Sequence, residues 1–176
     1  IGHHNDIAHW GLGLDQSGPV RVEAKGWTFP ESKIYDVPVE FEIRCDYNNG
    51  IKGTIASKNR MGTKWIGESG SIYVDRGKLE TTNPTWAEKE YAVGPKKVYE
   101  SSDHFANFVE CVQSRRDCVA SAEIGHRSIT PGHLGYLSNQ LGRALEWDPT
   151  REEVVNDSEA NALLRTVNYR RPRHLI

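Results

Sequence analysis

Cysteine is scarce in this chain, and its spacing excludes two classes of small protein. The three cysteines among 176 residues are Cys45, Cys111 and Cys118. An odd count with no C-x-x-C pair supports neither a disulfide framework nor a zinc ribbon. Because Cys45 falls in a strand-like alternation of apolar and charged residues, we predict that it is a small buried core residue.

The sequence also has little net charge and no long apolar run. Its net charge is −2 at pH 7, which gives no electrostatic reason to expect nucleic acid as a partner. No run approaches the roughly 18 apolar residues of a membrane span, so we expect no membrane partner. No signal peptide is visible, but the chain begins with isoleucine. We therefore expect a piece of a longer protein, whose compartment, cytoplasmic or exported, stays open.

A dinucleotide-binding fingerprint is missing as well. Gly11-Leu12-Gly13 is the only candidate, and the sixth position of the motif is Gln16 instead of glycine. The glycines follow a helical pattern, whereas the fingerprint needs a preceding buried strand. We predict that they end a helix and that this chain holds no cofactor-binding residue.

Hydrophobic periodicity changes along the chain from helix to strand and back to helix. Ile7 and Trp10 lie at helical spacing within a predicted helix over residues 1–12. From residue 20 to 82 the period is two, which predicts an antiparallel meander of about five to seven strands with a hairpin turn at Asn49-Gly50. The segment from residue 101 onward predicts three helices. The first covers residues 101–116 with Ser102 as N-cap. The second covers residues 129–147, with Thr130 as cap, Pro131 at its first position and Leu145 on its apolar face, and the third covers residues 156–167 and is capped near Asp157.

Strands followed by helices indicate an α+β fold, a mostly antiparallel twisted sheet with helices packed on one face. At this length we expect a single domain over residues 1–176. No Rossmann domain is expected within it.

The first helix carries the most chemically suggestive residues, His3, His4 and Asp6. A carboxylate near an imidazole can tune its charge across neutral pH, so this group is a candidate for acid–base catalysis. A satisfied helix start explains the same residues equally well. The spacing does not match a zinc motif, and we predict no metal site.

Two further groups are candidates for substrate binding. Lys64 and Trp65 precede a glycine-containing turn, and His126 and Arg127 lie in the stretch EIGHRSITPGH. The second stretch is also explained as a loop leading to a capped helix.

The order of several short motifs resembles the C-terminal domain of the Gfo/Idh/MocA oxidoreductases, over essentially the whole chain. These motifs are HHNDIAHWGLG, GPVRVEA, YDVPVEF, YNNG, GTKWIGESGSIYVDRG, SSDHFANFVECVQSRR, LGRALEWDP and DSEANALL. The resemblance is closest to the branch with a W-D-P turn. It implies a dihydrodipicolinate-reductase-like C-terminal domain that binds substrate and contributes oligomer contacts.

The resemblance also implies chemistry that this chain holds only in part. Family members oxidise or reduce a sugar, inositol or related polyol by hydride transfer with NAD or NADP, which the N-terminal Rossmann domain holds. His3 matches the histidine of the family's D-x-x-x-H motif, His4 is the neighbouring alternative, and Asp6 matches the aspartate three residues later. The first aspartate of that motif and the lysine of the E-K-P motif are absent, so we expect the isolated chain to be inactive.

Other readings stay open beside this one. The chain could serve as a non-catalytic carbohydrate-binding or assembly module. It could also belong to relatives that use the nicotinamide transiently to cleave glycosidic bonds. In each case we expect a small sugar or polyol as ligand and a homo-oligomer formed through the sheet.

Overall fold

The computed structural model describes residues 1–32, 34–88, 91 and 99–165. The chain divides into two compact units, one formed by residues 1–16 and 59–130 and the other by residues 17–58 and from 131 onward. Helix α3 (Ala122–Leu141) contributes its first part to unit 1 and its second part to unit 2. The expected single domain stays a prediction.

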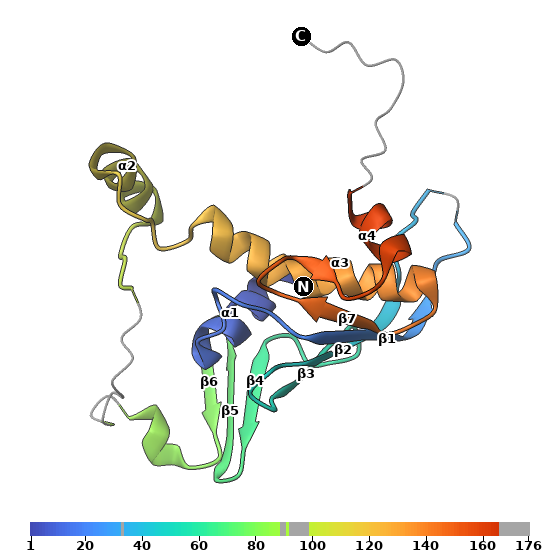
Figure 1. Ribbon diagram of the computed structural model, residues 1–176. Coiled ribbons are helices and arrows are strands. Elements are labelled where there is room, and N and C mark those ends of the chain that lie inside the picture. Colours follow the sequence, from blue (N-terminus) through green and yellow to red (C-terminus); the bar gives the residue numbers. More distant parts are fainter. Residues whose placement is uncertain (33, 89–90, 92–98, 166–176) are drawn as a thin grey trace. The chain divides into compact units, whose positions relative to one another are not determined.

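Unit 1 combines a short helix with a three-stranded antiparallel sheet of order β4-β5-β6 (Figure 1). Asn83 caps a 3₁₀ turn after β6, and Asp103, one residue later than predicted, caps α2 by accepting a hydrogen bond from the Ala106 N–H. The elements are α1 (Gly2–Leu12), β4 (Thr63–Gly67), β5 (Gly70–Asp75), β6 (Lys78–Thr81), η1 (Pro84–Ala87) and α2 (His104–Ser114).

Unit 2 contains a five-stranded antiparallel sheet of order β3-β2-β1-β7-β8. Its core lies between the sheet and the second part of α3, where Val22, Ile43, Leu134 and Leu145 are at most 1% exposed. Gly135 lets the helix approach closely, because a Cβ there would lie 2.5 Å from Ile43 Cδ1. The elements are β1 (Arg21–Thr28), β2 (Glu40–Asp46), β3 (Lys52–Ala56), β7 (Leu145–Asp148), β8 (Glu153–Val154) and α4 (Ser158–Arg165).

The α+β class, the antiparallel strands and most boundaries agree with the sequence prediction. Cys45 is buried, and Gly50 adopts the left-handed φ of 79° that the predicted hairpin turn requires. The expected continuous meander is instead divided into two sheets. Pairing partners such as Val22 and Leu145 are far apart in sequence, so local alternation gives no information on which strands join.

Two expectations about α3 were wrong. The helix begins at Ala122, so Thr130 and Pro131 lie inside it. The hydroxyl of Ser121 accepts a hydrogen bond from the Ile124 N–H at 3.3 Å and supplies the start that Thr130 was expected to supply. The helix ends at Leu141, where Gly142 adopts φ 66°, and Leu145 lies on strand β7 instead of on the helix.

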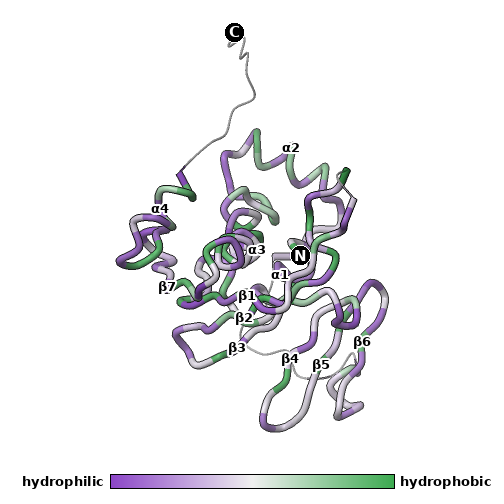
Figure 2. The backbone as a smooth tube through the Cα atoms, turned by 90° about the vertical axis from the view of Figure 1, so that its right-hand side faces the viewer, coloured by the Kyte–Doolittle hydropathy of each residue, from purple (hydrophilic) through white to green (hydrophobic). Residues whose placement is uncertain are grey.

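Helix α2 has its apolar stripe on the exposed side. Phe105, Phe108, Val109 and Val112 are 48–81% exposed, whereas Asn107 and Cys111 are buried. In the hydropathy view α2 therefore alternates between apolar and polar segments along its turns (Figure 2). Within the described residues this stripe does not form a core.

Candidate functional site

Helix α1 carries the predicted catalytic residues, and its end is set by glycine. Gly13 adopts φ 67°, and the N–H groups of Gly13 and Leu14 bond the carbonyls of Trp10 and His9 at 3.1 and 2.8 Å. This is the left-handed helix end that glycine favours, and it confirms Gly11-Leu12-Gly13 as a helix terminator. No strand-to-helix turn within the described ranges carries a glycine, so these residues do not fit a bound dinucleotide.

Ten of the 11 residues of α1, all except Leu12 at its end, divide into three faces. With about 100° of rotation per residue, positions three, four or seven apart share a face. The face toward the three-stranded sheet holds His4, Ala8 and Gly11; the face toward the first part of α3 holds Gly2, Asn5, Asp6 and His9; and the outward face holds His3, Ile7 and Trp10.

On the sheet side, β4 holds α1 through two side chains. Buried Thr63 donates its hydroxyl to the His4 carbonyl at 2.7 Å. The Trp65 indole N–H lies 3.4 Å from the Ala8 carbonyl, and its ring packs on Gly11, where a Cβ would lie 2.6 Å from the ring. Glycine at position 11 therefore makes the close approach of helix and strand possible.

His4 also meets a carboxylate at the end of β5. Its Nε2 lies 3.6 Å from Asp75 Oδ1, with 31% and 21% of the two side chains exposed. This distance fits an electrostatic contact better than a short hydrogen bond. The pKa of Asp75 is held below its ordinary value first by the Arg76 N–H, which bonds Oδ1 at 2.8 Å, and then by His4. Asp75 is thus a fixed negative charge facing the His4 ring.

On the side of α3, α1 is tied by a buried polar network. Asn5 donates its amide to the Ser128 carbonyl at 2.8 Å, and the Ser128 hydroxyl donates to Asp6 Oδ1 at 2.7 Å. Both Asn5 and Ser128 are buried. Because buried polar groups need such partners, this contact accounts for Asp6 as a helix-packing residue.

His9 lies deepest in this network, with 1% of its surface exposed. The Asn5 amide nitrogen lies 3.5 Å from its Nε2. Burial lowers the pKa of His9, against the opposing effect of the Asp6 and Asp15 carboxylates. The fold therefore favours the neutral imidazole at this position.

The outward face differs from the other two because its large side chains reach solvent. His3 is exposed and, within the described residues, forms no hydrogen bond or ion pair. Trp10 is 42% exposed and lies two helical turns further along the same face. Of the three predicted catalytic residues, His3 is therefore the one presented for an external molecule, while His4 and Asp6 have partners within unit 1.

The predicted substrate-binding residues are spread over several elements. Trp65 is used in packing against α1, whereas Lys64 lies on the opposite face of β4 and is exposed. His126 is exposed on α3, and Arg127 bonds Glu123 at 2.7 Å one turn earlier. Neither His126 nor Arg127 lies in the loop that the sequence favoured. Their role in binding stays a prediction.

Sequence reasoning missed the three residues that hold α1, namely Thr63, Asp75 and Ser128. Each is far from residue 4 in the chain, so no spacing rule connects them. A weak signal exists for Asp75, since it begins the turn Asp75-Arg76-Gly77 at the end of a predicted strand.

Two negative findings apply to the described part of the chain. It contains no group of three histidine, cysteine, aspartate or glutamate side chains that could hold a metal ion. It also contains no helix that is long and apolar enough to cross a membrane.

Comparison with known proteins relates this chain to oxidoreductases. A family model for the C-terminal alpha/beta domain of an oxidoreductase family, Gfo/Idh/MocA, matches residues 1–174. A search of curated proteins found no match.

Several solved structures have a similar fold. A Thermotoga maritima protein assigned provisionally as an oxidoreductase has a TM-score of 0.56 at 15% identity, over 81% of this chain and 44% of its own. An Agrobacterium radiobacter oxidoreductase, solved with NAD+, L-tartaric acid and magnesium, has a TM-score of 0.53 at 16% identity, over 81% and 46%.

A third neighbour is the provisionally assigned oxidoreductase yvaA of Bacillus subtilis, with a TM-score of 0.52 at 14% identity, over 84% of this chain and 50% of its own. The chain thus spans about half the length of the solved structures it matches, 44–50% of each. With the family model covering nearly every residue, the chain belongs to the Gfo/Idh/MocA oxidoreductase family, as its C-terminal α/β domain.

Proposed function

We propose that this chain is the substrate-binding part of an oxidoreductase that transfers a hydride between NAD or NADP and a sugar, inositol or related polyol. The proposal rests on one observation above all, the exposed His3 on a helix start that is fixed from two sides. The family assignment supports the reaction class. The neighbour solved with NAD+ supports the cofactor class.

In this proposal His3 exchanges a proton with the reacting hydroxyl of the substrate. An imidazole suits the task because it can accept and donate a proton near neutral pH. Trp10 on the same face offers a flat apolar surface to the C–H face of a sugar ring. The described residues do not fit the dinucleotide, so we assign no hydride step to this chain.

The experiment compares two histidine variants in the full-length protein. Turnover is followed by NADH or NADPH formation with myo-inositol or D-glucose as the probe. We expect His3→Ala to lower turnover by about 10²- to 10⁴-fold, the usual contribution of a positioned acid–base group. His133→Ala, which removes an exposed histidine of α3 in unit 2, is the matched control and should leave turnover unchanged. Equal activities of the two variants would refute the role of His3.

The isolated chain supplies a second test. Because its sequence carries no dinucleotide-binding fingerprint, it should neither bind NAD at micromolar concentration nor reduce it with either probe. Tight NAD binding by this chain alone would contradict the proposal that another part of the protein holds the cofactor.

A product assay on the full-length protein distinguishes dehydrogenation from transient use of the nicotinamide in glycoside cleavage, because only the former releases net NADH.

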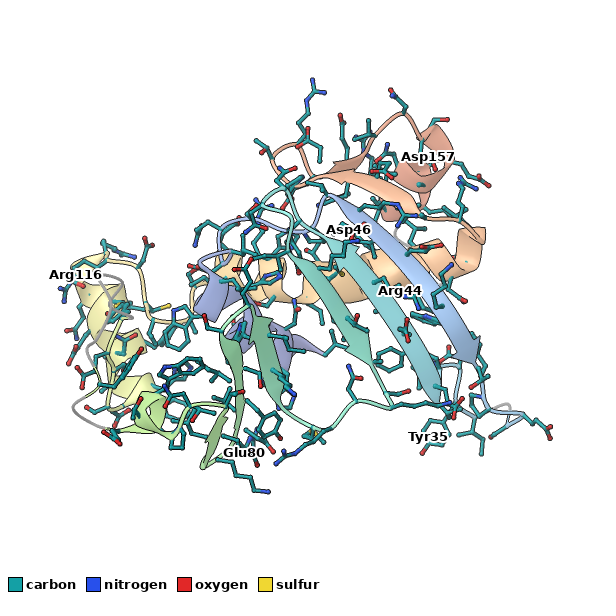
Figure 3. The ribbon with its side chains drawn as sticks, turned by 90° about the horizontal axis from the view of Figure 1, so that it is seen from below. Tyr35, Arg44, Asp46, Glu80, Arg116 and Asp157 are labelled. Atoms are coloured by element: carbon teal, nitrogen blue, oxygen red, sulfur yellow. The ribbon has the colours of Figure 1, made fainter. Side chains whose placement is uncertain are left out.

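We also propose that copies of the chain associate through the outer face of the five-stranded sheet. Side chains of both signs alternate there: Arg21 lies 3.3 Å from Glu146, Arg44 lies 2.6 Å from Glu42, and Asp46 lies beside Arg44 on β2 (Figure 3). Such a balanced face can complement itself across a two-fold axis. We expect Arg44→Glu to lower the oligomer mass in analytical ultracentrifugation, whereas Arg116→Glu, an exposed position outside this sheet, should not.

A further inference from the structure

We propose that Thr63 and Asp75 act as positioning residues for His3, by holding the neighbouring residue His4 on two sides. We call these two residues the first-turn clamp. The inference rests on the proposed function for its catalytic consequence, but the clamp itself is a statement about unit 1 and can be tested without a substrate.

The first half of the clamp holds the backbone. The Thr63 hydroxyl donates to the His4 carbonyl at 2.7 Å, although that carbonyl belongs to the first turn of α1. Thr63 is 7% exposed, so the bond is protected from competing water. A β-branched side chain on a strand has little rotamer freedom, which fixes the direction of the hydroxyl.

The second half holds the side chain. The His4 ring faces Asp75, and Asp75 is itself fixed by the Arg76 N–H at 2.8 Å. Lys78 and Arg60 supply further positive charge near Asp75. Arg60 is committed elsewhere, because it pairs with Glu80 at 2.6 Å and lies 3.8 Å above the Tyr73 ring. The carboxylate is therefore available to His4.

The clamp acts on the first turn of α1. This turn contains no acidic residue. The turn is closed by the bond from the Asn5 N–H to the Ile1 carbonyl at 3.1 Å. His3 lies within this turn, so its position depends on contacts made by its neighbours.

The two adjacent histidines, His3 and His4, therefore have different roles. One residue along the helix is a rotation of about 100°, so His3 points away when His4 points to the sheet. The His4 ring contacts Asp75, and the His4 carbonyl accepts a hydrogen bond from Thr63. The His3 ring makes no such contact within the described residues. The proposal is that this difference keeps His3 both ordered and accessible.

Hydrogen exchange of the Asn5 amide tests the clamp without any substrate. In the full-length protein we expect Thr63→Val and Asp75→Asn each to speed this exchange by about two- to fivefold, the effect of one hydrogen bond or one partly exposed ion pair. The matched controls are Thr81→Val, whose hydroxyl bonds Asn83, and Asp46→Asn, whose carboxylate lies 3.7 Å from Arg21 in unit 2. If the controls and the clamp variants give the same exchange rate at Asn5, the clamp does not exist.

A double-mutant cycle tests whether the clamp acts through His3. Asp75→Asn alone should lower turnover of the probe sugar by about two- to fivefold with an unchanged KM, and Asp75→Glu should restore part of it. In the His3→Ala background the same substitution should have no further effect. If the two losses multiply, Asp75 acts independently of His3 and the inference is overturned. If His3→Ala is fully active, the proposed function fails, and the exchange experiment alone decides on the clamp.

Discussion

Each unit joins one helix to one sheet through a glycine, but the two junctions differ in what surrounds them. Gly11 of α1 meets the Trp65 ring, where a Cβ would lie at 2.6 Å, and Gly135 of α3 meets Ile43, where it would lie at 2.5 Å. The junction in unit 2 is fully buried among apolar side chains. That in unit 1 is partly exposed and depends on polar contacts to the backbone.

Under the proposed function, this difference assigns stability to the junction in unit 2 and ligand contact to unit 1. A buried apolar junction contributes to the free energy of unfolding and offers nothing to a ligand. A helix held by polar contacts on two faces keeps its third face accessible in a defined orientation. Unit 2 is therefore the natural place for the stabilising core, and unit 1 the place where His3 is presented.

The largest effect on stability should come from the core of unit 2. Ile43 is 0% exposed, so Ile43→Ala should lower the free energy of unfolding of this chain by about 2–5 kcal/mol, measured by urea denaturation. Ile66→Ala on β4 is the matched control, because Ile66 is 79% exposed and its loss should change the value by at most about 0.5 kcal/mol. Similar costs at the two positions would contradict the contrast between the units.

A smaller effect is expected from filling the two glycine junctions. Gly135→Ala places a methyl group against three atoms of buried Ile43 and should cost about 1–3 kcal/mol. Gly11→Ala meets a partly exposed ring that can shift, so the gain in helix propensity of about 1 kcal/mol, which both variants share, offsets the clash at this position. Thermal unfolding of both variants measures which of the two substitutions costs more stability. A cost at Gly11 that exceeds the cost at Gly135 would reverse the comparison.

The smallest expected effect is a pH dependence from unit 1. Because burial lowers the pKa of His9 below its ordinary value of 6.5, the unfolded chain binds more protons than the fold as pH falls. The stability contributed by neutral His9 is complete above that value and is lost toward acid, with a slope of at most about 1.4 kcal/mol per pH unit.

Urea denaturation between about pH 7 and about pH 5 measures this slope. His9→Gln should flatten the slope, whereas His133→Gln, which changes an exposed histidine, should keep it. An unchanged slope in His9→Gln would show that another group is responsible.

Local sequence signals predicted the elements well where the signal and the structure are both local. The end of α1 at Gly13, the turn at Gly50 and the helix after Asp157 each depend on neighbouring residues. Thr130-Pro131 gave a wrong prediction of the helix start, because this typical start signal lies inside the helix. Both parts of that helix have tertiary contacts, at Ser128 and at Gly135, that outweigh the local preference.

The candidate site was predictable in its residues but not in its roles. His3, His4 and Asp6 are visible as a group of titratable side chains in the first helix. Which of them is accessible depends on Thr63, Asp75 and Ser128, which come from strands and a helix more than 50 positions away. Such contacts are set by the tertiary fold and leave no trace in the spacing of residues 3–6.

The most direct test of this account compares turnover of the full-length protein after His3→Ala and after His4→Ala, with the same probe sugar and cofactor. His3→Ala should lose about 10²- to 10⁴-fold, as expected for a group that transfers the proton. His4→Ala should lose at most about tenfold, since it removes one contact that positions its neighbour. A larger loss at His4 than at His3 would contradict the assignment of chemistry to the exposed histidine and positioning to the one held by Thr63 and Asp75.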